Sequence, residues 1–315
     1  MMKNSIITFV ILVICTLTLE AGLRIKNLGM RNYDIEMWKY SNALKFRSNS
    51  VILGHEHKKN ETAILQSVEI RTNSLGMRGD EPRNWDTIRR RVLFIGSSIT
   101  LGWGVPEEDT MTVLLDEALG SDTEVLNAGI GNYNAVRYIR AFLQSGKNLS
   151  PSDIVVHYFV NDAEKLDQGR DSWILRNSQL AVMGWILSQR FKAMINGGDL
   201  VRHYESAYAE TAPGFIEMQA ALADLNAYAK EKEIRLYFVM VPDIHNLMNY
   251  AFGFIHKKMK TIVEDQGMTF IDLLPAFDGI NDPQEVWAMP GDPHPNALGH
   301  HIMADYLLPH FELPE

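Results

Sequence analysis

The sequence predicts an α/β protein: a three-layer, doubly wound sandwich in which helices cover both faces of a mostly parallel, five-stranded sheet. Short apolar runs alternate along the chain with longer segments of helical character, and this alternation favours parallel pairing through crossover helices. The runs are apolar almost without interruption, which is typical of strands buried on both faces. The pattern becomes regular from Arg91 onward.

Each predicted strand is rich in β-branched or aromatic residues and ends at a glycine or a polar corner. The five strands are expected at residues 91–96, 124–128, 153–160, 235–241 and 268–273. Helices are expected at residues 109–119, 135–147, 215–232, 257–266 and 297–308. Ligands of such sheets bind just beyond the carboxyl ends of the strands. Four polar or small residues fall there: Ser98, Gly131, Asn161 and Asp243.

Length and composition allow one large core. The chain has 315 residues, of which 46% are hydrophobic and 22% charged, and these are ordinary values for a globular protein. The formal net charge of −9 argues against a nucleic-acid partner. The only cysteine, Cys15, lies in an N-terminal apolar run. The folded body therefore has no cysteine nucleophile, disulfide or thiolate metal site.

The N-terminal run, residues 5–19, is too apolar to begin a soluble domain. Its length lies between a signal-peptide core and a full membrane span of about 17–25 residues. The small-x-small cleavage pattern after it is poor, so we expect an uncleaved signal anchor rather than a cleaved peptide. The body would then lie outside the cytoplasm, in the periplasm or at the cell surface. A buried N-terminal helix is disfavoured because the run has no polar stripe.

The chain is therefore divided into an anchor at residues 1–25, a connecting region at 26–90 and a catalytic domain at 91–315. Residues 164–213 form an insertion that is more aromatic and aliphatic than a plain crossover needs. One or two extra helices packed on the sheet edge would explain it. A lid over the site, or a surface that contacts a membrane or a partner, would explain it as well.

Four strand-end corners carry the residue types that acyl transfer needs. Ser98 is a candidate nucleophile, and residues 129–132 are a small-residue turn with backbone donors. Asn161 could donate to an oxyanion, and Asp292 with His294 would supply a base and its orienter. Each corner alone is common, but their order and their positions after strands together indicate a serine-dependent site.

These residues resemble the motifs of the SGNH (GDSL-like) hydrolases, from about residue 73 to 305. The segment at residues 71–79 and the N-terminal anchor resemble a membrane-attached bacterial branch of that family. The resemblance implies that Ser98 is the nucleophile, His294 the base and Asp292 its partner. It implies an oxyanion hole formed by the Ser98 N–H, the Asn161 side chain and the N–H of Gly131 or Asn132. It implies no metal, nucleotide or other cofactor.

The sequence departs from the family pattern at three places. Ser97 stands where the acid that braces the nucleophile turn is usual, and Phe159 replaces a glycine. The acid Asp292 precedes His294 by two residues rather than three. None of these departures removes a catalytic group.

We expect a serine-dependent carboxylic ester hydrolase, an esterase or deacetylase, acting through an acyl-enzyme on a small-molecule or glycan ester. Two alternatives remain open. The same residues would serve an O-acyltransferase for envelope or extracellular polysaccharide, and a catalytically silent carbohydrate-binding protein could share the fold.

Overall fold

The computed structural model describes residues 2–29, 32–166, 172–195 and 199–312. Its centre is a five-stranded sheet in the order β6-β5-β7-β8-β9, and every neighbouring pair is parallel. The strands are β5 (Arg90–Gly96), β6 (Thr123–Gly129), β7 (Asp153–Phe159), β8 (Arg235–Val241) and β9 (Thr269–Asp272). The predicted α/β class, strand count and strand positions are confirmed.

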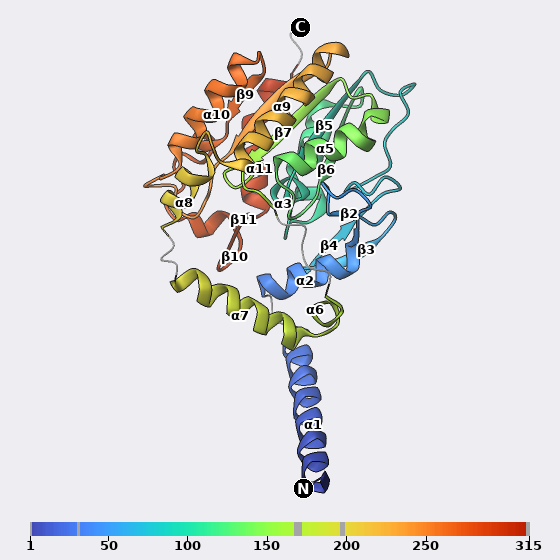
Figure 1. The fold of residues 1–315 in the computed structure, drawn as a ribbon. Helices are drawn as coiled ribbons and strands as arrows, with labels where there is room; N and C mark the ends of the chain where they lie inside the picture. The colour runs from blue at the N-terminus through green and yellow to red at the C-terminus, as the bar shows by residue number, and fades with distance from the viewer. Residues whose placement is uncertain (1, 30–31, 167–171, 196–198, 313–315) are drawn as a thin grey trace.

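Two helical layers cover the sheet, and the alternation of side chains along the strands separates their cores (Figure 1). Leu93 and Ile95 of β5 face one layer, whereas Val92 and Phe94 face the other. The first layer contains α5 (Ala135–Ser145), α9 (Pro213–Glu231) and α10 (Gly253–Asp265). The second contains α4 (Met111–Leu119) and α11 (Ala297–Phe311).

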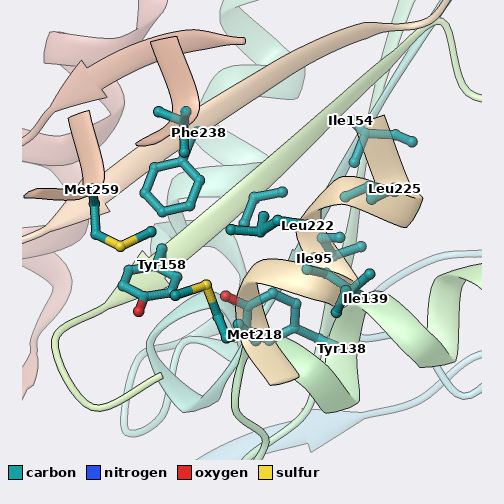
Figure 2. Close-up of a cluster of buried hydrophobic side chains, with 14 of the residues drawn as sticks. Ile95, Tyr138, Ile139, Ile154, Tyr158, Met218, Leu222, Leu225, Phe238 and Met259 are labelled. Atoms are coloured by element: carbon teal, nitrogen blue, oxygen red, sulfur yellow. The ribbon is translucent and has the colours of Figure 1, made fainter. Parts of the chain in front are cut away.

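The larger core lies under the first layer (Figure 2). Met218 and Leu222 of α9 pack on Tyr158 of β7 and Phe238 of β8, and all four side chains are fully buried. Burial of this many large side chains on a parallel sheet fixes the strands against one another. The loops at their carboxyl ends therefore start from rigid positions.

The region expected as a connection contains short elements of its own. They are α2 (Tyr33–Leu44), the hairpin of β1 (Lys45–Arg47) with β2 (His55–His57), and the hairpin of β3 (Thr62–Leu65) with β4 (Val68–Arg71). Tyr40, Leu65 and Ile70 bury their side chains against Trp103 of the body. Strands of three or four residues give almost no periodic signal, so packing on the body, not local sequence, explains their formation.

The insertion forms three helices, α6 (Trp173–Asn177), α7 (Gln179–Ile195) and α8 (Leu200–Ala207), although residues 167–171 and 196–198 of it lie outside the described residues. Tyr204 of α8 joins the large core. By contrast, α7 packs on α2 rather than on the sheet edge, through Val182 and Ile186 against Ile35.

At the N-terminus, α1 (Met2–Lys26) projects from the body as a separate helix (Figure 1). Residues 4–26 are long and apolar enough to cross a membrane, and none of that window is buried in the protein. An apolar helix without a polar face and without protein cover is suited to a lipid environment.

Candidate active site

Ser98 and His294 meet at the carboxyl edge of the sheet. Ser98 is the first residue of α3 (Ser98–Leu101), directly after β5, and His294 lies in β11 (Asp292–Pro295), which pairs with β10 (Trp287–Met289). The Ser98 Oγ lies 2.8 Å from the His294 Nε2. The His294 Nδ1 lies 2.5 Å from the Asp292 Oδ1. Three residues expected to act together are thus within hydrogen-bond reach in the order serine, histidine, aspartate.

The Asp292 carboxylate is buried and accepts hydrogen bonds on both oxygens. Besides the His294 ring, its Oδ2 accepts from the Gln66 Nε2 at 2.6 Å. Burial raises the pKa of Asp292, but the hydrogen bonds from His294 and Gln66 outweigh it and hold the pKa below its usual value. The group is therefore a carboxylate at neutral pH and can orient the imidazole.

The expected oxyanion donors other than the Ser98 N–H follow β6 and β7, the two strands that flank β5. In the described part of the chain, no hydrogen-bond partner is found for the Ser98 N–H, the Asn132 N–H or the Asn161 side-chain amide. The Gly131 N–H differs, because it donates to the Tyr40 hydroxyl at 2.9 Å. Asn132 has φ +65°, in the left-handed region.

Asp162 holds the turn that presents Asn161. Its Oδ2 accepts from the Phe159 N–H at 2.9 Å and from the Tyr138 hydroxyl at 3.0 Å. Burial raises the pKa of Asp162 to about 8. Its position below the surface agrees with the expectation that this residue fixes the loop and takes no part in the chemistry.

Residues 33–66 contribute contacts to the site that the sequence did not predict. The Tyr33 ring stacks on the His294 ring, with centroids 5.8 Å apart and planes 26° apart. The Lys45 Nζ donates to the Gly131 carbonyl at 2.7 Å and to the Asn132 Oδ1 at 2.8 Å. With Gln66, these residues support both the base and the oxyanion turn. No motif marks them in a single sequence.

Arg78 braces the turn behind the nucleophile. Its buried guanidinium donates to the carbonyls of Leu101, Gly102 and Val105 at 2.6–2.7 Å. The Leu101 and Gly102 carbonyls lie at the end of the short helix that Ser98 begins, and an arginine there satisfies groups that a helix leaves unpaired. The segment at residues 71–79 therefore fixes the turn that lacks the usual acid at Ser97.

A second Asp-x-His pair follows β8. The His245 Nδ1 lies 2.6 Å from the Asp243 Oδ1, as in the first pair, but within the described residues His245 makes no hydrogen bond with Ser98. The Trp287 indole N–H donates to the Ile244 carbonyl at 2.9 Å, which joins this loop to β10. Among the described residues, no group of three His, Cys, Asp or Glu side chains is arranged to hold a metal ion.

Comparisons with known proteins concern the same part of the chain. Residues 94–302 match the model of the GDSL-like Lipase/Acylhydrolase family. No curated protein matches the chain.

Among solved structures, the chain is similar to the acetylxylan esterase Axe2 from Geobacillus stearothermophilus. Identity is 15%, the TM-score is 0.48, and the match covers 72% of this chain and 96% of Axe2. The esterase EstA from Pseudoalteromonas sp. matches at 15% identity and TM-score 0.43, over 70% of this chain and 94% of EstA. The acetyl xylan esterase AlAXEase matches at 20% identity and TM-score 0.44, over 70% of this chain and all of that protein. Similarity at this level leaves the substrate open.

Proposed function

Since the chain belongs to the GDSL-like lipase/acylhydrolase family, we propose that it is a serine-dependent carboxylic ester hydrolase that works through an acyl-enzyme. The observation that carries the proposal is the continuous contact from the Ser98 Oγ through the His294 ring to the Asp292 carboxylate. A hydroxyl is a weak nucleophile at neutral pH and needs such a base to attack an ester.

In the acylation step, the Ser98 Oγ attacks the ester carbonyl carbon while its proton passes to the His294 Nε2. Negative charge develops on the carbonyl oxygen. It is stabilised by hydrogen bonds donated by the Ser98 N–H, the Asn132 N–H and the Asn161 amide. We assign Asn132 rather than Gly131 to this role, because the Gly131 N–H is already bound by Tyr40. Collapse of the tetrahedral intermediate breaks the ester C–O bond, and His294 returns the proton to the departing alcohol.

In the deacylation step, water attacks the acyl-enzyme and gives its proton to His294. The carboxylic acid leaves as the Ser98 hydroxyl is restored by the same proton. A sugar hydroxyl in place of water would give an O-acyltransferase with the same residues, so the competition between water and acceptor decides between the two activities.

We also propose that α1 is an uncleaved anchor and that the rest of the chain, residues 26–315, lies on the extracytoplasmic side. The exposed apolar surface of residues 4–26 supports the anchor. The absence of cysteine from the body is compatible with an oxidising compartment.

The test is hydrolysis of a p-nitrophenyl ester series, from acetate to long chain, by the full protein and by Ser98→Ala. Loss of a serine nucleophile can lower turnover by about 10⁶. The matched controls are His294→Ala and His245→Ala, since the two histidines have the same Asp-x-His geometry and only His294 contacts Ser98. Activity should disappear in His294→Ala and remain in His245→Ala. Survival of activity in Ser98→Ala would refute the proposal.

A donor acetyl ester with and without a glycan acceptor separates the two activities. Acid release that does not change with acceptor supports the hydrolase. Acetylated glycan formed at the expense of free acid would assign the transferase instead. No turnover by the parent protein on any ester, with intact glycan binding, would indicate a silent binding protein.

A further inference from the structure

Helix α7 carries large apolar side chains on more than one side, although only one side is covered by α2. Its sequence also contains the polar residues Ser188, Gln189, Arg190 and Lys192. Val182 and Ile186 face α2 and are buried. On the other sides, Trp185, Leu187 and Phe191 are 53–60% exposed. Large apolar side chains exposed outside the packed side of a helix indicate a contact with lipid or with another protein.

The exposed apolar surface continues onto α6, which precedes α7. Trp173 is 76% exposed and Ile174 is 59% exposed. Every other exposed residue of α7 whose side chain is described is uncharged. We define the outer apolar surface as Trp173, Ile174, Trp185, Leu187 and Phe191. Large exposed apolar side chains gathered on two consecutive helices mark a contact site rather than a solvated face.

The start of α7 is fixed to the inner end of α1. The Glu20 carboxylate accepts hydrogen bonds from the Gln179 and Leu180 N–H groups and so caps α7. The Arg24 Nη2 donates to the Asn177 carbonyl at 2.6 Å, and the Asn27 Nδ2 donates to the Gln179 Oε1 at 2.8 Å. Figure 1 shows α7 lying across this end of α1, between it and the body.

These contacts fix the depth of α7 if α1 enters a membrane. The apolar run ends at Leu19, so Glu20 is the first charged residue after it. Fifteen residues of helix extend about 22 Å at 1.5 Å per residue, which is most of a hydrocarbon core of about 30 Å. Glu20 and the start of α7 would therefore lie at the membrane–water interface. Tryptophan is enriched at that depth.

We propose that the outer apolar surface of α6 and α7 lies in the interface of the bilayer that α1 enters, so that the protein is held to the membrane at two places. This inference rests on the proposal that α1 is an anchor. The bilayer is favoured over a protein partner because α7, which carries the surface, begins at the end of the proposed anchor and is held there by the Glu20 contacts. With a net charge of −9, attachment would depend on apolar area and would not need anionic lipid.

The proposed membrane contact would place the candidate active site close to the bilayer. Ile35 of α2 packs on α7, and Tyr33, two residues earlier, stacks on His294. One helix layer thus separates the outer apolar surface from the catalytic base. The ester-cleaving edge of the sheet faces the membrane end of the molecule (Figure 1).

The experiment uses the full chain, one copy per nanodisc of phosphatidylcholine, with a spin label on a single cysteine. The native Cys15 reports whether α1 is in the bilayer. In a Cys15→Ser background, Leu187→Cys places the label on α7, and Glu231→Cys places it at the far end of α9, just before the amino edge of β8. Collisions with oxygen, which concentrates in lipid, are compared with collisions with water-soluble Ni-EDDA.

We expect the ratio of oxygen to Ni-EDDA accessibility to be several-fold higher at residue 187 than at residue 231. A ratio at 187 equal to that at 231, with Cys15 in lipid, would overturn the proposal and leave the anchor intact. A label at 187 shielded from both reagents would overturn it in favour of a protein contact. A water-exposed Cys15 would remove its premise, and hydrolysis by the same sample would show whether the proposed function stands independently.

Discussion

The catalytic body and the N-terminal region at residues 32–79 contribute different kinds of residue to one site. The body, which contains the family match at residues 94–302, carries the groups proposed to react. The N-terminal region lies outside that match and carries groups that hold them, such as Gln66 on Asp292 and Lys45 on the oxyanion turn. The proposed nucleophile and oxyanion donors follow buried strands of the sheet, and the proposed base lies in the short strand β11. Their supports come from short elements packed on top.

This difference suggests how a fold shared by many enzymes acquires its own site. Parallel strands bring reactive groups to one edge, because their carboxyl ends meet there. Neighbouring residues fix the fine orientation of those groups. Loss of such a neighbour should lower the catalytic rate less than loss of a reacting group does, but more than a change at the surface. Substitutions in the two regions should therefore differ in size and in kind.

The largest effect in this comparison is expected at Asn161. Asn161→Ala removes one proposed oxyanion donor and should lower kcat by about 10² to 10³. The matched control is Asn148→Ala, the same change at an exposed asparagine that precedes the amino end of β7. Ester kinetics for the two variants check this, and a loss below tenfold at Asn161 would exclude its amide from the oxyanion hole.

A smaller loss is expected at Gln66. Gln66→Leu leaves the Asp292 Oδ2 without its donor, and a hydrogen bond to a charged group contributes about 1.5–3 kcal/mol, or roughly 10- to 100-fold in rate. The rate at which a fluorophosphonate labels Ser98 should fall by a similar factor, since it reports the serine–histidine pair without an ester substrate. Ile70→Val perturbs the same small core without touching the site. Equal losses in both variants would mean that Gln66 acts only through stability.

Substitution of Lys45 should lower kcat and leave KM nearly unchanged. Lys45→Met keeps the apolar stem and removes both hydrogen bonds to the Gly131–Asn132 turn. We expect kcat to fall about tenfold, the equivalent of one such bond of about 1.4 kcal/mol. Steady-state kinetics test this, and a rise in KM at constant kcat would instead assign Lys45 to substrate binding.

The smallest effect on activity is expected for Asp162→Asn. The same substitution should clearly change how stability depends on pH. The pKa of Asp162 is raised by burial to about 8, against roughly 3.9 in an unfolded chain. The folded state therefore binds the extra proton, and the stability contribution of this group is full below about pH 4 and is lost as pH rises to about 8. Asp162→Asn keeps an acceptor for the Phe159 N–H and the Tyr138 hydroxyl.

Thermal unfolding at pH 5 and pH 8.5 checks this. The variant should gain in Tm relative to the parent as pH rises. A difference in Tm that is the same at both pH values would contradict the raised pKa.

The body could be predicted from sequence because its strands are long apolar runs and its helices have the length of ordinary crossovers. The corners at Ser98 and Asn161 followed from that prediction, because strand ends define the site edge. His294 was found instead from its Asp-x-His motif near the C-terminus, and it lies in β11. Their roles as nucleophile, oxyanion donor and base remain predictions.

The supports at Tyr33, Lys45 and Gln66 could not be predicted for a physical reason. Tyr33 belongs to a helix of twelve residues, Lys45 to a strand of three, and Gln66 to the turn between β3 and β4. The position of each depends on contacts with the body. Gln66 lies in a tight turn at φ +50°, and its contact with Asp292 joins residues 226 positions apart. Local sequence carries no signal for such a contact. The choice of Asn132 over Gly131 likewise depended on Tyr40, a residue of α2.

Those separations also have a consequence in time. Ser98 meets His294 across 196 positions, and Gln66 meets Asp292 across 226, so the site joins early and late parts of the chain. A chain made from its N-terminus has its nucleophile long before its base emerges. Esterase activity would then begin only when β11, which carries His294, and α11 are in place. In a folding or export assay, the onset of ester cleavage would time the completion of the whole body.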